Sequence, residues 1–169
     1  MKRLILLCSL LILGITSLNA QVEIDQAKAK FIYNFTKFFE WPASERSGDF
    51  VIGVVGSNSI YQELDNYTEG KKVIVQNINV KKLSSVDEAG DCHILFVSKY
   101  RISQLDKVSE SNTKNTLLIS DSEKGIDKGA ALNFILEGNR LKYEFAASNA
   151  MSKGLKFSSR IRDMASKNY

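Results

Sequence analysis

Residues 50–56 read FVIGVVG, a continuous apolar run that ends in a glycine. A strand with one face in water alternates apolar and polar residues, whereas a strand covered on both faces reads as an unbroken apolar run. Strands of parallel sheets are of the second kind, because helices cover both of their faces. The run therefore predicts a strand at the centre of a parallel sheet.

Two further apolar runs, at residues 92–97 and 116–120, repeat this pattern along the chain. Residues 60–64 and 102–108 lie between the runs and have the three- and four-residue spacing of apolar side chains that is typical of helices. Residues 73–80 alternate and predict another strand, at an edge of the sheet. Alternation of strands and helices indicates an α/β fold with a mainly parallel sheet.

The pattern changes after this region. Residues 130–136 and 141–146 are strand-like runs joined by a Gly-Asn turn, which predicts an antiparallel hairpin. Residues 149–167 are helical in character. We therefore expect a single α/β domain over residues 21–169, a three-layer sandwich whose mainly parallel central sheet carries a C-terminal antiparallel hairpin and flanking helices.

Residues 31–42 read FIYNFTKFFEWP and hold six of the chain's sixteen aromatic residues. Their spacing predicts a helix over residues 22–41 that ends at Pro42 and carries five of the six on one arc. Such an arc ordinarily packs on a sheet, although a ligand cage, a membrane anchor or a partner groove are alternatives. Tyr33 lies off the arc and Trp41 at its edge, so we expect any partner or ligand contact at these two residues.

The first twenty residues, MKRLILLCSLLILGITSLNA, combine a basic start, a short apolar run and a small residue at the end. This order is that of a secretory signal peptide. The run is short for a membrane span, which needs about 20 apolar residues. We expect cleavage after Ala20 and export to the periplasm; the alternative is an uncleaved N-terminal anchor.

Without residues 1–20, which carry two basic and no acidic side chains, the chain has 21 basic and 19 acidic residues and a net charge of +2. No basic run is long enough to indicate nucleic acid binding, and no second long apolar segment indicates membrane insertion. Cys92 is the one cysteine left, so we expect no internal disulfide. Its thiol is expected either to be buried or to form an intermolecular link.

Cys92 and His93 are the only adjacent pair of reactive side chains, and His93 is the only histidine. Neighbouring residues of a strand point to opposite faces of the sheet, so the two cannot act as nucleophile and base. A zinc site needs three or four ligands, which this pair does not supply. We expect no cofactor, no metal and no enzymatic activity, and a hydrolase is the least favoured class.

Small polar residues follow each of the three predicted parallel strands. In open α/β sheets, ligands bind in the crevice outside the carboxyl ends of the strands. The alternative role for such residues is to cap helices and form turns. The candidate crevice residues are Ser57, Asn58, Ser98, Ser120 and Asp121.

Taken together, these segments resemble the YfiR family, also called the YfiR/HmsC type, of bacterial periplasmic proteins. FIYNFTKFFEWP is similar to the opening motif of that family. FVIGVVGS, CHILFVS, TLLISDSEKGIDKGAALNFI, LKYEF and GLKFSSRIRDMA follow in the family's order, so the resemblance covers nearly all of the chain after the first twenty residues. The disulfides of well-known members have no counterpart, because only Cys92 is present.

The resemblance implies regulation rather than catalysis. Well-known members bind the periplasmic domain of an inner-membrane diguanylate cyclase, hold it inactive, lower cyclic di-GMP and restrain biofilm formation; they are α/β sandwiches that can form homodimers. For such a partner we expect a surface near the hairpin and the C-terminal segment, with Glu144, Phe145, Leu155 and Phe157 as contacts. A periplasmic protein that binds a small ligand or lipid in the crevice, without a cyclase partner, is the alternative.

Overall fold

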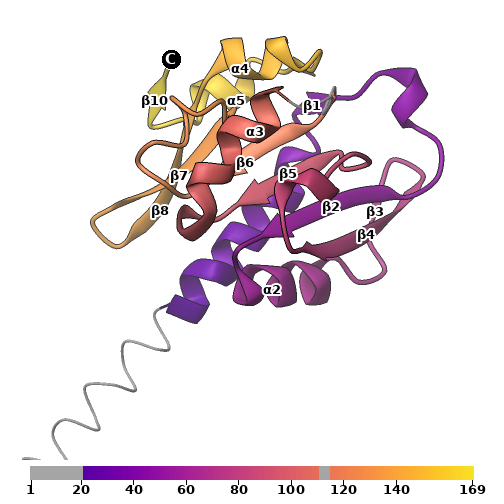
Figure 1. Cartoon of the computed structure of the whole chain (residues 1–169), viewed down its shortest axis with the longest axis horizontal. Helices are drawn as coiled ribbons and strands as arrows, with labels where there is room; N and C mark the ends of the chain where they lie inside the picture. Colours follow the sequence, from indigo (N-terminus) through magenta and orange to yellow (C-terminus); the bar gives the residue numbers. More distant parts are fainter. Residues whose placement is uncertain (1–20, 111–114) are drawn as a thin grey trace, which may run out of the picture.

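The computed structural model describes residues 21–110 and 115–169, so the expected signal peptide over residues 1–20 lies outside the described residues. An eight-stranded mixed sheet forms the centre of the fold, with the strand order β10-β8-β7-β6-β5-β2-β4-β3 (Figure 1). Its strands in chain order are β2 (Phe50–Val55), β3 (Lys72–Val73), β4 (Gln76–Leu83), β5 (Ile94–Val97), β6 (Leu117–Ser120), β7 (Leu132–Glu137), β8 (Arg140–Phe145) and β10 (Lys167–Asn168).

The centre of the sheet is parallel, as predicted from residues 50–56. Strands β4, β2, β5, β6 and β7 pair with one another in parallel in that order. All six residues of β2 are buried. Gly53 lies inside this strand, and its neighbours leave no room for a side chain. A Cβ atom there would come within 2.7 Å of Cys92 Sγ and 2.8 Å of Leu83 Cδ1. Its role is therefore close packing between neighbouring strands.

Each face of the sheet has its own apolar core, because alternate strand residues point to opposite sides. The first helix (residues 21–35) and α2 (Asn58–Thr68) contribute to the core on one face, and Figure 1 shows both on the same side of the sheet. The core on the other face includes residues of α3 (Leu105–Glu110). The remaining helical elements are η1 (Ala43–Glu45), η2 (Val86–Glu88), η3 (Lys99–Gln104), α4 (Ala147–Ser152) and α5 (Arg160–Asp163). Among the described residues, no helix is both long and apolar enough to cross a membrane.

The prediction of one helix reaching Trp41 is wrong, because the helix ends at Phe35. The next three backbone N–H groups bond to carbonyls three residues back, which forms a tighter turn. Phe39 then starts strand β1 (Phe39–Glu40) and pairs antiparallel with Phe157 of β9 (Lys156–Phe157). Phe39 is 5% exposed, so pairing and burial of its ring outweigh one more helical turn.

The prediction of a single strand over residues 73–80 is also wrong. The chain turns back at Ile74 and Val75, so that β3 and β4 form an antiparallel hairpin. Ile74 adopts a φ of 56°, which β-branched residues rarely do. Both turn residues are largely exposed, at 79% and 73%.

The C-terminal third combines a confirmed hairpin with a partly wrong helix prediction. β7 and β8 pair antiparallel from Leu132 with Phe145 to Glu137 with Arg140, as the Gly-Asn turn predicted. Residues 149–167 do not form one broken helix, because β9 separates α4 from α5. β9 pairs with β1, and β10 adds to the outer side of β8 in parallel. These pairings with distant strands replace the local helical preference.

Candidate functional site

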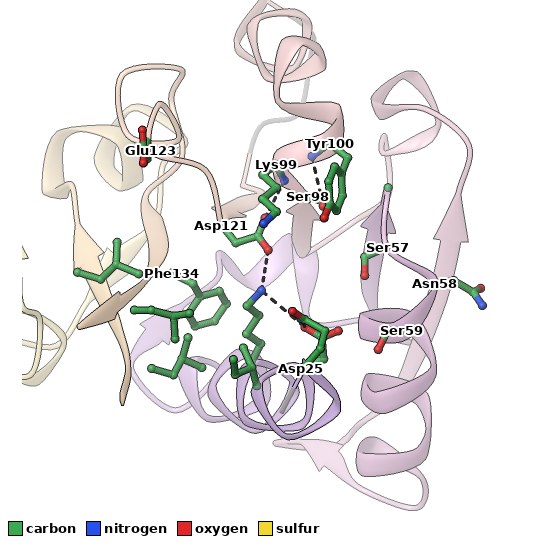
Figure 2. A pocket seen from close by; sticks show the side chains of 17 residues that line it. Asp25, Ser57, Asn58, Ser59, Ser98, Lys99, Tyr100, Asp121, Glu123 and Phe134 are labelled. Carbon is green, nitrogen blue, oxygen red and sulfur yellow. Dashed lines mark hydrogen bonds and ion pairs between the residues drawn. The ribbon is translucent and has the colours of Figure 1, made fainter. Parts of the chain in front are cut away.

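The strand order contains a topological switch point. β4 and β5 lie on opposite sides of β2, so the connections that leave the carboxyl ends of β2 and β5 diverge. Ligand-binding crevices of open α/β sheets lie at such points. A cleft of about 640 Å³ opens there (Figure 2). It is lined by Gln21, Ile24, Asp25, Lys28, Gly56, Ser57, Asn58, Ser59, Ser98, Lys99, Tyr100, Asp121, Glu123, Phe134, Ile135, Leu136 and Leu141.

Four of the five predicted crevice residues line this cleft, namely Ser57, Asn58, Ser98 and Asp121. Ser120 does not line it. It is the last residue of β6 and fully buried, and its hydroxyl donates a hydrogen bond of 2.9 Å to the carbonyl oxygen of Val97. Its role is to join two neighbouring strands.

Two of the cleft residues also cap helices. Ser57 Oγ accepts a hydrogen bond of 3.2 Å from the backbone N–H of Ile60, in the first turn of α2. Ser98 Oγ accepts one of 3.4 Å from Tyr100 at the start of η3. Figure 2 shows Asn58 directed outward, away from Asp121. The capping alternative is therefore confirmed for Ser57 and Ser98.

A nearly buried group of three charges forms the floor of the cleft. Lys28 Nζ lies 2.6 Å from Asp121 Oδ2 and 3.7 Å from Asp25 Oδ1, and the three side chains are 6–11% exposed. The other Asp121 oxygen accepts a 2.7 Å hydrogen bond from the backbone N–H of Lys99 (Figure 2). Gln21 Nε2 donates a 2.9 Å bond to Asp25. The triad of Asp25, Lys28 and Asp121 is thus fixed, with one negative charge in surplus.

The triad was not predicted from the sequence, although one feature of the sequence indicates it. Lys28 lies within the apolar arc of the first helix, and Asp25 stands three residues before it on the same face. A charged side chain on a buried arc requires a partner, because an unpaired buried charge is very costly. The partner Asp121 is 93 residues away in the sequence, so no local pattern identifies it.

The remaining wall of the cleft is apolar. It consists of Ile24 from the first helix, and of Phe134, Ile135 and Leu136 from β7 with Leu141 from β8. Clefts that combine an apolar wall with a few fixed polar groups are typical of small-molecule sites. The cleft can therefore accept a ligand with one polar and one apolar side.

The predicted partner residues divide into two groups by burial. Trp41, Phe145 and Leu155 are 6%, 0% and 3% exposed and belong to the core. Trp41 Nε1 donates a 3.2 Å hydrogen bond to the carbonyl oxygen of His93, which ties the aromatic segment to the start of β5. These three side chains present almost no surface to a partner.

Tyr33, Glu144 and Phe157 are half-buried and keep part of their surface. The Tyr33 ring lies edge-on to Tyr67, with 5.8 Å between centroids. Glu144 accepts hydrogen bonds of 2.9 Å from Asn133 Nδ2 and 3.0 Å from the Tyr169 hydroxyl. Phe157 packs on Phe39 and Phe145.

Cys92 and His93 serve the structure, as their opposite orientations predict. Cys92 is a buried free thiol, and burial raises its pKa to about 11. His93 Nδ1 accepts a 3.1 Å hydrogen bond from the backbone N–H of Val51, so Nε2 carries the proton and donates to the carbonyl oxygen of Glu45 at 2.8 Å. The ring also stacks on Phe50. In the described part of the chain, no cluster of three His, Cys, Asp or Glu side chains is arranged to hold a metal ion.

Comparison with known proteins identifies one family. A family model described as YfiR/HmsC-like matches residues 25–166, which is nearly the whole described chain. No curated protein matches the sequence.

Proposed function

The chain belongs to the YfiR/HmsC-like family, and from this premise we propose that it is a periplasmic regulatory protein that represses a membrane-bound diguanylate cyclase or a similar sensor. It binds the periplasmic domain of that inner-membrane protein and holds it inactive. Cyclic di-GMP then stays low, and biofilm formation is restrained. The observation that carries the proposal is the match over residues 25–166.

Two features of the chain support this role. The first twenty residues have the order of a secretory signal peptide, which supports export of the remainder to the periplasm. Cys92 and His93 are the only adjacent reactive side chains in the sequence. Burial of the thiol and the hydrogen bonds of the imidazole give both residues a structural role, so their presence does not require catalysis. Regulation by binding is therefore favoured over catalysis.

We place the partner contact on the half-buried members of the predicted set. Phe157 and Glu144 lie on β9 and β8, near the C-terminal segment, and Tyr33 lies on the first helix. An aromatic ring that keeps part of its surface can enter a pocket of a partner. We also propose that the protein can form a homodimer, which the resemblance to the family implies.

The test is a pull-down of detergent-solubilised inner membranes with the exported protein, tagged after Tyr169. Recovery of a membrane protein that has a periplasmic sensor domain and a cyclase domain supports the proposal. Tyr33→Ala and Phe157→Ala should reduce this recovery. Tyr100→Ala is the matched control, because Tyr100 is 78% exposed and lies at the cleft. Failure to recover any such protein contradicts the proposal.

A second candidate function is binding of a small ligand or lipid in the cleft, without a cyclase partner. The observation that favours it is the position of a 640 Å³ cleft at the switch point of the sheet. This volume lies within the range of about 300–1,000 Å³ that is usual for ligand pockets. Native mass spectrometry of protein purified from its own host tests it: a bound mass supports this function, and a protein that is always empty contradicts tight binding.

A further inference from the structure

A second hollow lies outside the cleft, between the C-terminal end of the first helix and strand β8. This groove has a volume of about 450 Å³ and shares only Leu141 with the cleft. Several residues of the aromatic segment 31–42 line this groove, and the proposed regulatory role does not explain them. It is lined by nine residues: Phe31, Asn34, Phe35, Lys37, Phe38, Leu141, Lys142, Tyr143 and Met164.

The floor of the groove is aromatic and held in place. The Phe35 and Tyr143 rings meet edge to face with 5.1 Å between centroids, and Phe31 lies 5.9 Å from Phe35 and 6.1 Å from Tyr143. The Tyr143 hydroxyl is also fixed, because it donates a 2.8 Å hydrogen bond to the carbonyl oxygen of Ile161. The floor is therefore formed before any ligand arrives, which lowers the entropic cost of binding.

The charges at the groove have one sign. Lys37 and Lys142 are the charged residues of its lining, and no carboxylate lines it. Lys142 is paired with Glu137. Among the described residues Lys37 is in no ion pair. Its Nζ donates a 2.7 Å hydrogen bond to Asn34 Oδ1 and lies 5.2 Å from the centroid of the Tyr33 ring. An entering anion therefore meets the Lys37 ammonium group, which has no competing carboxylate partner in the part of the chain that the structure describes.

From this geometry we propose that the groove binds a small amphiphilic anion, a carboxylate that carries an apolar chain, such as a free fatty acid. The apolar chain lies on Phe31, Phe38 and Leu141, which line the groove and are half-buried. The carboxylate lies at Lys37. Met164, which is 51% exposed, covers one side, and its flexible side chain adapts to chains of different shape.

The size of the groove favours a small molecule over a protein. A specific protein interface takes about 20–30 residues from each side, whereas nine residues line this groove. Its volume of about 450 Å³ lies in the usual range for small-molecule pockets. This proposal does not depend on the regulatory role, because the isolated protein suffices for its test.

Titration of the purified exported protein with sodium laurate tests the proposal, at concentrations where laurate is monomeric. Calorimetry should show saturable binding of one laurate per chain. Methyl NMR locates it, because Met151 and Met164 are the only methionines after residue 20. The Met164 methyl signal should shift with laurate. Met151 is exposed on α4 and is not part of the groove lining, so its signal should stay in place.

Charge variants test the recognition of the carboxylate. Lys37→Glu should weaken laurate binding about tenfold, because an attractive charge becomes a repulsive one. Lys72→Glu makes the same charge change at an exposed position of β3, at the opposite end of the sheet, and should leave binding unchanged. Dodecyltrimethylammonium, which has a chain of similar length with a cationic head, should bind at least tenfold more weakly than laurate.

Three outcomes would overturn the proposal. The first is no saturable binding of laurate by the wild-type protein. The second is binding that shifts Met151 and leaves Met164 unchanged, which would place the ligand elsewhere. The third is equal binding of laurate by Lys37→Glu and Lys72→Glu, or equal binding of the cationic amphiphile, which would show apolar adsorption without recognition of charge. A failed pull-down of the cyclase affects none of these measurements.

Discussion

Neutralising one member of the triad under the cleft should destabilise the domain strongly. In Lys28→Met, the carboxylates of Asp25 and Asp121 lose the ammonium group that lies 3.7 Å and 2.6 Å away, at sites where the side chains are 6% and 11% exposed. Removing one partner of a buried ion pair costs about 3–5 kcal/mol, because an uncompensated charge stays buried. Asp121→Asn should cost less, about 2–3 kcal/mol, because Asp25 still faces Lys28 and the amide oxygen can still accept from the Lys99 N–H.

The double variant Lys28→Met/Asp121→Asn separates the ion pair from other effects of the two changes. It removes the Asp121 carboxylate that Lys28→Met alone leaves buried and unpaired, although Asp25 still lacks its partner. Its cost should therefore fall below the sum of the single costs by at least about 1 kcal/mol. Urea unfolding at constant slope measures the four free energies. The coupling should persist in 0.5 M salt, because buried pairs are screened little.

The exposed pair of Lys142 and Glu137 provides the control, because these side chains are 44% and 46% exposed. Its coupling, measured with Lys142→Met and Glu137→Gln, should be smaller and should fall with salt. If the Lys28 and Asp121 changes are additive within about 0.5 kcal/mol, the triad does not act as a unit and the description of the cleft floor is wrong.

Two further predictions concern the core. Phe35→Ala, at a side chain that is 1% exposed, should lower the free energy of unfolding by about 3–5 kcal/mol; an unchanged melting temperature would contradict a core role for the aromatic segment. The Cys92 thiol, whose pKa burial raises from 9.0 to about 11, should react with a disulfide reagent at pH 8 only after unfolding. Fast labelling of the folded protein at pH 8 would refute the burial of the thiol. Because the thiol of the unfolded chain ionises at lower pH than that of the folded protein, the stability that the neutral thiol contributes is complete below pH 9 and is lost as pH rises towards 11.

The parts of the fold that the sequence predicts correctly are those where burial and local pattern agree. The run at residues 50–56 is apolar throughout because the strand is covered on both faces, and β5 and β6 are buried along their whole length for the same reason. The hairpin of β7 and β8 follows from its Gly-Asn turn, with Gly138 at a φ of 60°.

The wrong predictions arise where contacts between distant residues decide the structure. Phe39 has a place on a helical arc, but its pairing with Phe157 makes it a strand residue. Ile74 and Val75 are strand-forming residues by propensity, and only the antiparallel pairing of Val73 with Gln76 places them in a turn. Propensity is a local quantity and cannot report these pairings.

The cleft shows the same division. Polar residues after parallel strands predict its location, and Ser57, Asn58, Ser98 and Asp121 line it. The charge arrangement of its floor depends on Lys28, which comes from the first helix and not from a strand end. A rule about strand ends therefore locates the cleft but omits the residues that the helix contributes.

Regulation of a cyclase from the periplasm is tested most directly by cyclic di-GMP in the host bacterium. Nucleotide extracts should contain more cyclic di-GMP when the gene is deleted, and a copy of the full chain should restore the lower level. A copy that starts at residue 21 behind an initiator methionine should fail to restore it, because it stays in the cytoplasm. Unchanged cyclic di-GMP in the deletion strain, or full restoration by the copy without residues 1–20, would contradict the account.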